Sequence, residues 1–195
     1  MDVDKLTARL QYTVFGSAEG PMEAFGNGIG LAAYGDANGG SVKTRVPSRT
    51  SGVARADIEL VVNIPNGPAP ITISQTGPGW VQVVGCSGTV KATAGGGGLY
   101  VGGPVAGFTL SATGGDVKVE AEAPLTATST ASSPNNLTVS LQRGQGGKFT
   151  AKGAEVSVQQ TVLGTNEATI VSGDLGLPGP AISLSAKNRV EVTQP

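Results

Sequence analysis

The chain has no histidine and only one cysteine, Cys86, among its 195 residues. Without histidine, Ser-His-Asp and Cys-His nucleophilic sites are excluded, together with most zinc sites, which use imidazole or several thiolates. A single cysteine also excludes an internal disulfide. We therefore expect a protein that is not an enzyme and that holds no metal and no cofactor.

Charged and aromatic residues are also scarce. Charged residues make up 14% and aromatic residues 4% of the chain, and the net charge is -1. Nucleic-acid binding usually depends on a basic surface, so no nucleic-acid partner is expected. Because aromatic residues are so few, the core must be built from Val, Leu, Ile and Ala.

No apolar run in the sequence approaches the length of a transmembrane helix, which needs about 18 residues or more, so no membrane span is expected. The first residues, MDVDKLTARLQ, carry acidic side chains and no apolar run, which is not the pattern of a signal peptide. As written, the chain is expected in the cytoplasm. The cell surface or envelope is expected instead if a leader or anchor was removed or is supplied by a partner.

Glycine and proline are abundant, at 31 and 12 residues, and they separate short apolar-polar alternations. Val81-Gln82-Val83 and Val117-Lys118-Val119-Glu120 are examples of these alternations. A period of two puts successive side chains on opposite faces, as in a half-buried strand. Residues 58–122 contain no window long enough for a helix. The sequence therefore predicts an all-β fold.

A repeat with a period of about 27 residues is the pattern that we take to organise these strands. The segment at 88–92 is echoed by the segment at 115–119, and the same offset takes Val81 onto Phe108. Three strand positions recur together, which predicts a right-handed β-solenoid, or β-helix, with about three strands per turn. An antiparallel β-sandwich or an open barrel is the alternative.

We expect one domain over residues 1–195. Residues 1–50 would form an N-terminal strand, from Leu6 to Phe15, followed by a Gly-rich loop or cap, and residues 51–195 would form the repeat body. A short amphipathic helix over residues 4–12 is the alternative for the first strand.

Several short motifs resemble those of the adhesin-like β-solenoid family of bacterial and archaeal envelope proteins. A strand ends in a V-x-I-P-x-G step at residues 62–67, and residues 172–175 resemble the S-G-D-V of the family. The family's G-x-V-x-V repeats are matched at residues 79–83, 88–92 and 115–119. The resemblance spans residues 45–192 and implies a β-solenoid fold with adhesive activity. The chain departs from the family in lacking a leader or anchor and in its irregular, Pro-rich segments at 124–134 and 176–181.

Trp80 and Tyr100 are the candidate surface-binding residues, because their rings are the ones most able to stack on a sugar. Trp80 follows Pro78-Gly79, so a core-capping role at a strand start is the alternative. Paired carboxylates can hydrolyse glycosides. The clustered acids Asp116, Glu120 and Glu122 alternate along one strand, however, and an exposed polar face explains them better.

Charge is nearly absent from the middle of the chain, where Lys91 is the only charged residue between positions 59 and 116. Neutral lateral faces favour packing on another copy or on a protein partner. We therefore expect a non-catalytic, adhesin-like or scaffold protein that presents a β-solenoid surface and forms a homo-oligomer or binds a protein. A carbohydrate-binding module of the cell envelope is the alternative function, and a small hydrolase is a distant third.

Overall fold

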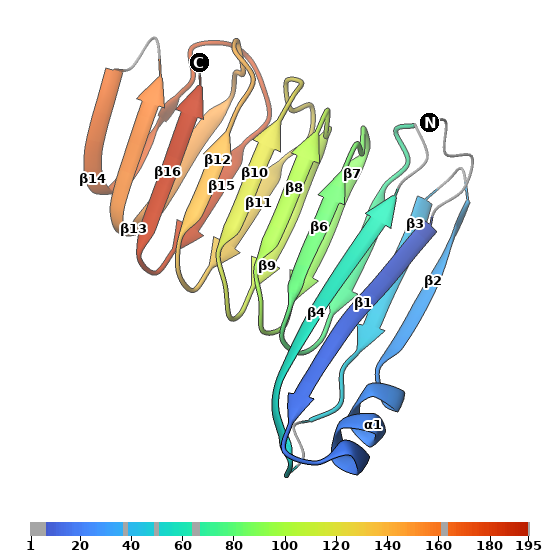
Figure 1. Cartoon of the computed structure of the whole chain (residues 1–195). Helices are drawn as coiled ribbons and strands as arrows, with labels where there is room; N and C mark the ends of the chain where they lie inside the picture. The colour runs from blue at the N-terminus through green and yellow to red at the C-terminus, as the bar shows by residue number, and fades with distance from the viewer. Residues whose placement is uncertain (1–6, 37–38, 49–50, 64–66, 161–163, 195) are drawn as a thin grey trace.

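The computed structural model describes residues 7–36, 39–48, 51–63, 67–160 and 164–194 of the chain. In these residues, sixteen strands join into one continuous sheet, and one helix lies at the N-terminal end (Figure 1). The prediction of an all-β fold is confirmed. Residues 64–66 of the V-x-I-P-x-G step lie outside the described residues, as does Leu6 at the start of the expected N-terminal strand.

Most strands lie in two rows, and the chain passes from one row to the other after each strand between β5 and β12. The first row consists of β4 (Val53–Asn63), β6 (Trp80–Val84), β8 (Leu99–Gly103), β10 (Val117–Ala121), β12 (Leu137–Ser140) and β16 (Arg189–Gln194). The second row consists of β3 (Gly39–Arg45), β5 (Ile71–Gln75), β7 (Thr89–Ala94), β9 (Gly107–Ala112), β11 (Ser129–Ser133) and β15 (Ile182–Ala186). Neighbours within each row are parallel.

The strand register shows that the repeat expected from the sequence is wrong. Val81 pairs with Leu99, Leu99 pairs with Val117, and Val117 pairs with Leu137, so the chain returns to its own row much sooner than that repeat requires. Each circuit of the chain thus contributes two strands, not three. The 27-residue offset expected from the sequence equals one and a half circuits of 18 residues, so it relates a strand of one row to a strand of the other row. Val81 and Phe108 are both buried, but on β6 and β9, which do not pair.

The alternative of an antiparallel sandwich is also wrong for this body. Among the described strands, antiparallel pairing is confined to β1 with β4, β2 with β3, and β13 with β14. Parallel strands must be joined by a connection that returns to the same end of the sheet. Here the connecting strand of the opposite row makes that return.

The two rows are joined into one sheet by β13 (Lys148–Gln160). Its first part, residues 149–152, pairs with β15, and its second part, residues 155–160, pairs with β16. The edge strand β14 (Gly164–Asp174) pairs with β13. At the other end, β1 (Thr7–Gly16) extends the first row and β2 (Gly30–Asp36) extends the second. These two strands are neighbours there, so the sheet nearly closes on itself (Figure 1).

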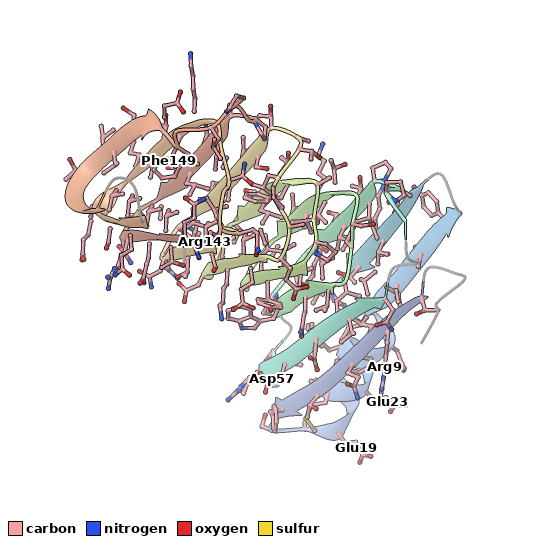
Figure 2. All side chains as sticks on the ribbon, turned by 90° about the horizontal axis from the view of Figure 1, so that it is seen from above. Arg9, Glu19, Glu23, Asp57, Arg143 and Phe149 are labelled. Atoms are coloured by element: carbon pink, nitrogen blue, oxygen red, sulfur yellow. The ribbon has the colours of Figure 1, made fainter. Side chains whose placement is uncertain are left out.

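The core lies between the two rows and consists of apolar side chains stacked on their equivalents in the next strand. From the first row, one such stack contains Leu60, Val81, Leu99, Val117, Leu137 and Val190. Ile71, Val90 and Phe108 form part of a stack from the second row. Figure 2 gives the view from above and labels Phe149, a buried ring of β13. As expected, Val, Leu, Ile and Ala make up most of this core.

The N-terminal strand is confirmed over Thr7–Gly16, but the Gly-rich loop expected after it contains a helix, α1 (Glu19–Asn27). The helix places Phe25 in a second apolar cluster with Val53, Ala56 and Ile58 of β4. Glycine and proline, both poor helix formers, occur within this short segment and hide its pattern in the sequence. No helix of the described residues is long and apolar enough to cross a membrane.

Candidate functional site

The candidate site lies on the outward face of the first row, where the parallel register aligns side chains from neighbouring strands. Glu59 of β4 lies opposite Trp80 of β6. On the next outward position, Gln82 of β6 lies opposite Tyr100 of β8, which lies opposite Lys118 of β10. The register therefore brings the two aromatic residues proposed from the sequence onto adjacent strands of one face.

Trp80 is on the surface and half exposed, so the core-capping interpretation is wrong. Its indole ring lies over the backbone of Gly98. A Cβ atom added to Gly98 would lie 2.6 Å from ring atoms Cη2 and Cζ3. Only glycine leaves room for the ring at this point, and a glycine in or beside a strand commonly marks such a close approach.

Tyr100 has the same relation to a second glycine. A Cβ atom added to Gly102 would lie 2.6 Å from the Tyr100 hydroxyl oxygen and 3.0 Å from Cζ. The hydroxyl donates a hydrogen bond of 2.5 Å to Glu120 Oε2. Lys118 Nζ lies 2.7 Å from Glu120 Oε1 and 5.7 Å from the centre of the Tyr100 ring. The ring is thus held in place by a glycine below it, a carboxylate at its tip and a cation beside it.

These contacts fix the protonation states of the pair. The hydrogen bond to Glu120 raises the pKa of Tyr100 to about 12. Hydrogen bonds from Lys118 and then from Tyr100 hold the pKa of Glu120 below its ordinary value. Because both pKa values move away from neutrality, Tyr100 stays protonated and Glu120 stays ionised over a wide range around pH 7.

Two open grooves meet at the aromatic pair. The first groove has a volume of about 980 Å³ and extends from the pair towards β1 and β4. The second groove has a volume of about 430 Å³ and extends towards β12 and β16. Trp80 and Tyr100 line both. The first groove is otherwise lined by Leu10, Gln11, Tyr12, Thr13, Asp57, Ile58, Glu59 and Gln82. The second is otherwise lined by Asp116, Val117, Lys118, Asn136, Leu137, Thr138, Arg189 and Glu191.

The charges in the second groove are balanced by neighbouring groups. Arg189 lies 3.5 Å from a carboxylate oxygen of Glu155 and 4.0 Å from one of Glu191. Asp116 accepts hydrogen bonds from the backbone N–H and the side-chain amide of Asn136, at 3.0 and 3.2 Å. Lys118 is paired with Glu120. A ligand in this groove would therefore meet no single unpaired charge.

The first groove differs in having an uncompensated carboxylate. Asp57, labelled on β4 in Figure 2, lies 2.7 Å from the guanidinium of Arg55. Within the described part of the chain, the Glu59 carboxylate has no hydrogen bond and no ion pair. The lining of this groove contains two acids and neither lysine nor arginine. The first groove is thus the more negative of the two.

The outward face of the second row has a different character, because hydroxyl side chains align across its strands. One line of register partners contains Ser41, Thr72, Lys91, Thr109, Thr130, Ser183 and Thr150. A parallel line contains Lys43, Ser74, Thr93, Ser111, Ser132, Ser185 and Lys152. These two lines contain three lysines and no carboxylate, and Tyr34 of β2 aligns with Ser41 at the end of the first line. The middle strands of this face carry one charge in these lines, Lys91, whereas Lys43 and Lys152 lie at its two ends.

The clustered acids and the single cysteine have different surroundings in the described structure. Of the three clustered acids, Glu120 is bonded to Tyr100, Asp116 is bonded to Asn136, and Glu122 follows the end of β10. Cys86 is buried, and burial raises the pKa of its thiol, which makes it a poor nucleophile. The described residues contain no group of three or more His, Cys, Asp or Glu side chains placed to hold a metal ion.

Comparison with known proteins found no matching family model, no matching curated protein and no matching solved structure. The resemblance to the adhesin-like family therefore remains a prediction. Sequence reasoning found Trp80 and Tyr100 but missed Glu59, Lys118 and the two glycines beneath the rings. These residues are brought together by the strand register, which could not be deduced from the sequence.

Replacing Gly98 with alanine tests the placement of the indole. The added methyl group would lie 2.6 Å from the ring, so the ring must move and its exposure must change. Trp80 is the only tryptophan, so its fluorescence emission and its quenching by acrylamide report on it alone. We expect both to change in Gly98→Ala but not in Gly173→Ala, where a Cβ meets nothing within 4 Å. Unchanged quenching in a folded Gly98→Ala protein would contradict the placement.

Titration of Tyr100 tests the second contact. The raised pKa means that phenolate absorbance from Tyr100 appears only near pH 12. Glu120→Gln removes the negative acceptor, and Gly102→Ala pushes the ring away from it. Both changes are expected to lower the pKa of Tyr100 towards about 10. The difference between the ultraviolet titration curves of the wild type and of Tyr100→Phe gives the contribution of Tyr100 to the phenolate absorbance. If Glu120→Gln leaves that part unshifted, the hydrogen bond is not formed in solution.

Proposed function

We propose that this protein is a non-catalytic, adhesin-like binding protein whose body is a β-solenoid with two strands per turn. Its aromatic face, defined as Trp80, Tyr100 and the two grooves that they share, binds an extended carbohydrate of the cell envelope. The observation that carries this proposal is the placement of both rings on one outward face, each lying over a glycine, at the point where the two grooves meet.

The chemistry of the face suits a sugar chain. A pyranose ring has a flat apolar face that gains from leaving water against an exposed aromatic ring, and hydroxyls at its rim that need hydrogen-bonding partners. Gln11, Thr13 and Gln82 supply such partners beside Trp80. A stable protein partner would need roughly 800 Å² of complementary surface on each side. Two grooves that share only a pair of rings favour a slender ligand over a protein.

The arrangement also favours an extended ligand over a single sugar. The two grooves share the aromatic pair, and their linings extend from β1 to β16. Seven strands lie side by side over this distance, and neighbouring strands are about 4.8 Å apart, so the face spans roughly 29 Å. A chain of several sugar units would cross the strands along this path.

The protonation states support a role without catalysis. A general acid or base works best with a pKa near the working pH. At the aromatic face the pKa of Tyr100 is raised to about 12 and the pKa of Glu120 is lowered. Neither group is suited to exchange protons with a substrate at neutral pH. Their role in the proposal is to hold the ring of Tyr100 in position.

Carbohydrate binding favours the cell surface or envelope over the cytoplasm as the site of action, in line with the resemblance to adhesin-like proteins. On the opposite side, the outward lines of the second row hold mostly hydroxyl side chains, with Lys91 in the middle and Lys43 and Lys152 at the ends. Self-association of the protein is proposed to use this opposite surface, because the aromatic face then remains free for the ligand.

Trp80→Ala tests the proposal. We expect a β-linked oligosaccharide selected from a glycan array to quench Trp80 fluorescence and to bind the wild-type protein in calorimetry. Removing the indole takes away the largest apolar contact, so affinity should fall by about tenfold or more. Tyr100→Ala should also weaken binding, whereas Tyr100→Phe keeps the ring and should retain most of it.

Tyr34→Ala is the matched control. Tyr34 lies on β2, is 63% exposed, and lines neither groove. Its removal should leave binding unchanged. If Trp80→Ala and Tyr100→Ala both keep wild-type affinity for every glycan that the protein binds, or if no glycan binds, the proposal is wrong.

A further inference from the structure

We infer that the carbohydrate bound on the aromatic face carries positively charged amino groups, and that one of them lies between Glu59 and Trp80 in the first groove. The ligand class is an amino-sugar polymer with free amines rather than a neutral or N-acetylated glycan. This inference rests on the proposed function and goes further by naming the chemistry of the ligand.

The charge of the first groove is the first observation. Its lining holds Asp57 and Glu59 and no basic residue. Asp57 is already paired with Arg55, so Glu59 is the acid left to receive a ligand. The nearest basic residue on β1, Arg9, aligns with Val61 and forms no ion pair with Glu59 in the described structure. A carboxylate without a partner beside a groove favours a cationic ligand.

The geometry of Glu59 and Trp80 is the second observation. The two residues are direct register partners on adjacent parallel strands, so their Cα atoms are about 5 Å apart. Both side chains are on the outward face. An ammonium group here can form a charge-assisted hydrogen bond with the carboxylate while it lies near the indole, which attracts cations through its π electrons. An N-acetyl group lacks the charge and would lose both interactions.

The second groove explains why the amine is assigned to the first. There, Asp116 is bonded to Asn136, and Glu191 is near Arg189. Lys118 is paired with Glu120, and Arg189 also lies near Glu155, so the second groove offers an ammonium group no free carboxylate. A polymer with free amines therefore gains its charge-dependent affinity at the Glu59 end of the face.

The experiment compares three β-1,4-linked oligosaccharides of equal length, made of glucosamine, of N-acetylglucosamine and of glucose. Affinities are measured by calorimetry and by Trp80 quenching for the wild type and for Glu59→Gln. The wild type is expected to bind the glucosamine oligomer about tenfold more tightly than the other two. Glu59→Gln should abolish most of this preference and leave binding of the two neutral oligomers within about twofold.

Glu23→Gln is the control for general attraction between a cationic oligomer and an acidic surface. Glu23 is an exposed acid of α1, labelled in Figure 2, and lies outside both grooves. Its substitution should leave the preference unchanged. An equal loss in Glu23→Gln and Glu59→Gln, or a preference that survives Glu59→Gln, overturns the inference.

The same data separate failure of the inference from failure of the proposed function. Equal binding of all three oligomers, weakened by Trp80→Ala, would retain carbohydrate binding and reject the amino-sugar assignment. Binding of none of them, with no binder on a wider glycan array, would reject both.

Discussion

The parallel, in-register stacking of strands within each row is the constraint on which the rest of the structure depends. The pairing of Val81 with Leu99, of Leu99 with Val117 and of Val117 with Leu137 places one apolar side chain directly on the next. Since side chains alternate along a strand, a slip by one residue would expose this entire set. Burial of the inward stacks therefore fixes which residues face outward and which of them are neighbours.

The same backbone arrangement produces two unlike outer faces. On the second row, the outward lines are mostly threonine and serine, so that face is nearly uniform. On the first row, the outward positions hold Trp80 and Tyr100, with Gly98 and Gly102 beneath them. The glycines lower the surface locally and let each ring lie over the sheet. The aromatic face thus comes from a few positions in a regular sheet.

Alternation and turn residues were enough to predict an all-β fold and the N-terminal strand. They could not predict the pairing, because the strands have similar patterns and G-x-V segments, such as 79–81 and 88–90, begin strands of both rows. The sequence similarity between strands of opposite rows produced the wrong prediction of three strands per turn. Trp80 and Tyr100 could be proposed as stacking residues from their chemistry alone. Their proximity to each other, and to Glu59 and Lys118, depends on register and could not be seen.

The central claim is that the ligand binds on the first-row face. Its most direct test is a map of backbone amide and indole N–H chemical-shift changes by NMR during titration with a β-1,4-linked oligosaccharide. We expect the shift changes to centre on Trp80, Gly98 and Gly102 and to extend to Glu59, while the signals of Thr109 and Thr130 on the opposite face stay unchanged. Changes centred on Thr109 and Thr130, or no localised changes at saturation, would contradict it.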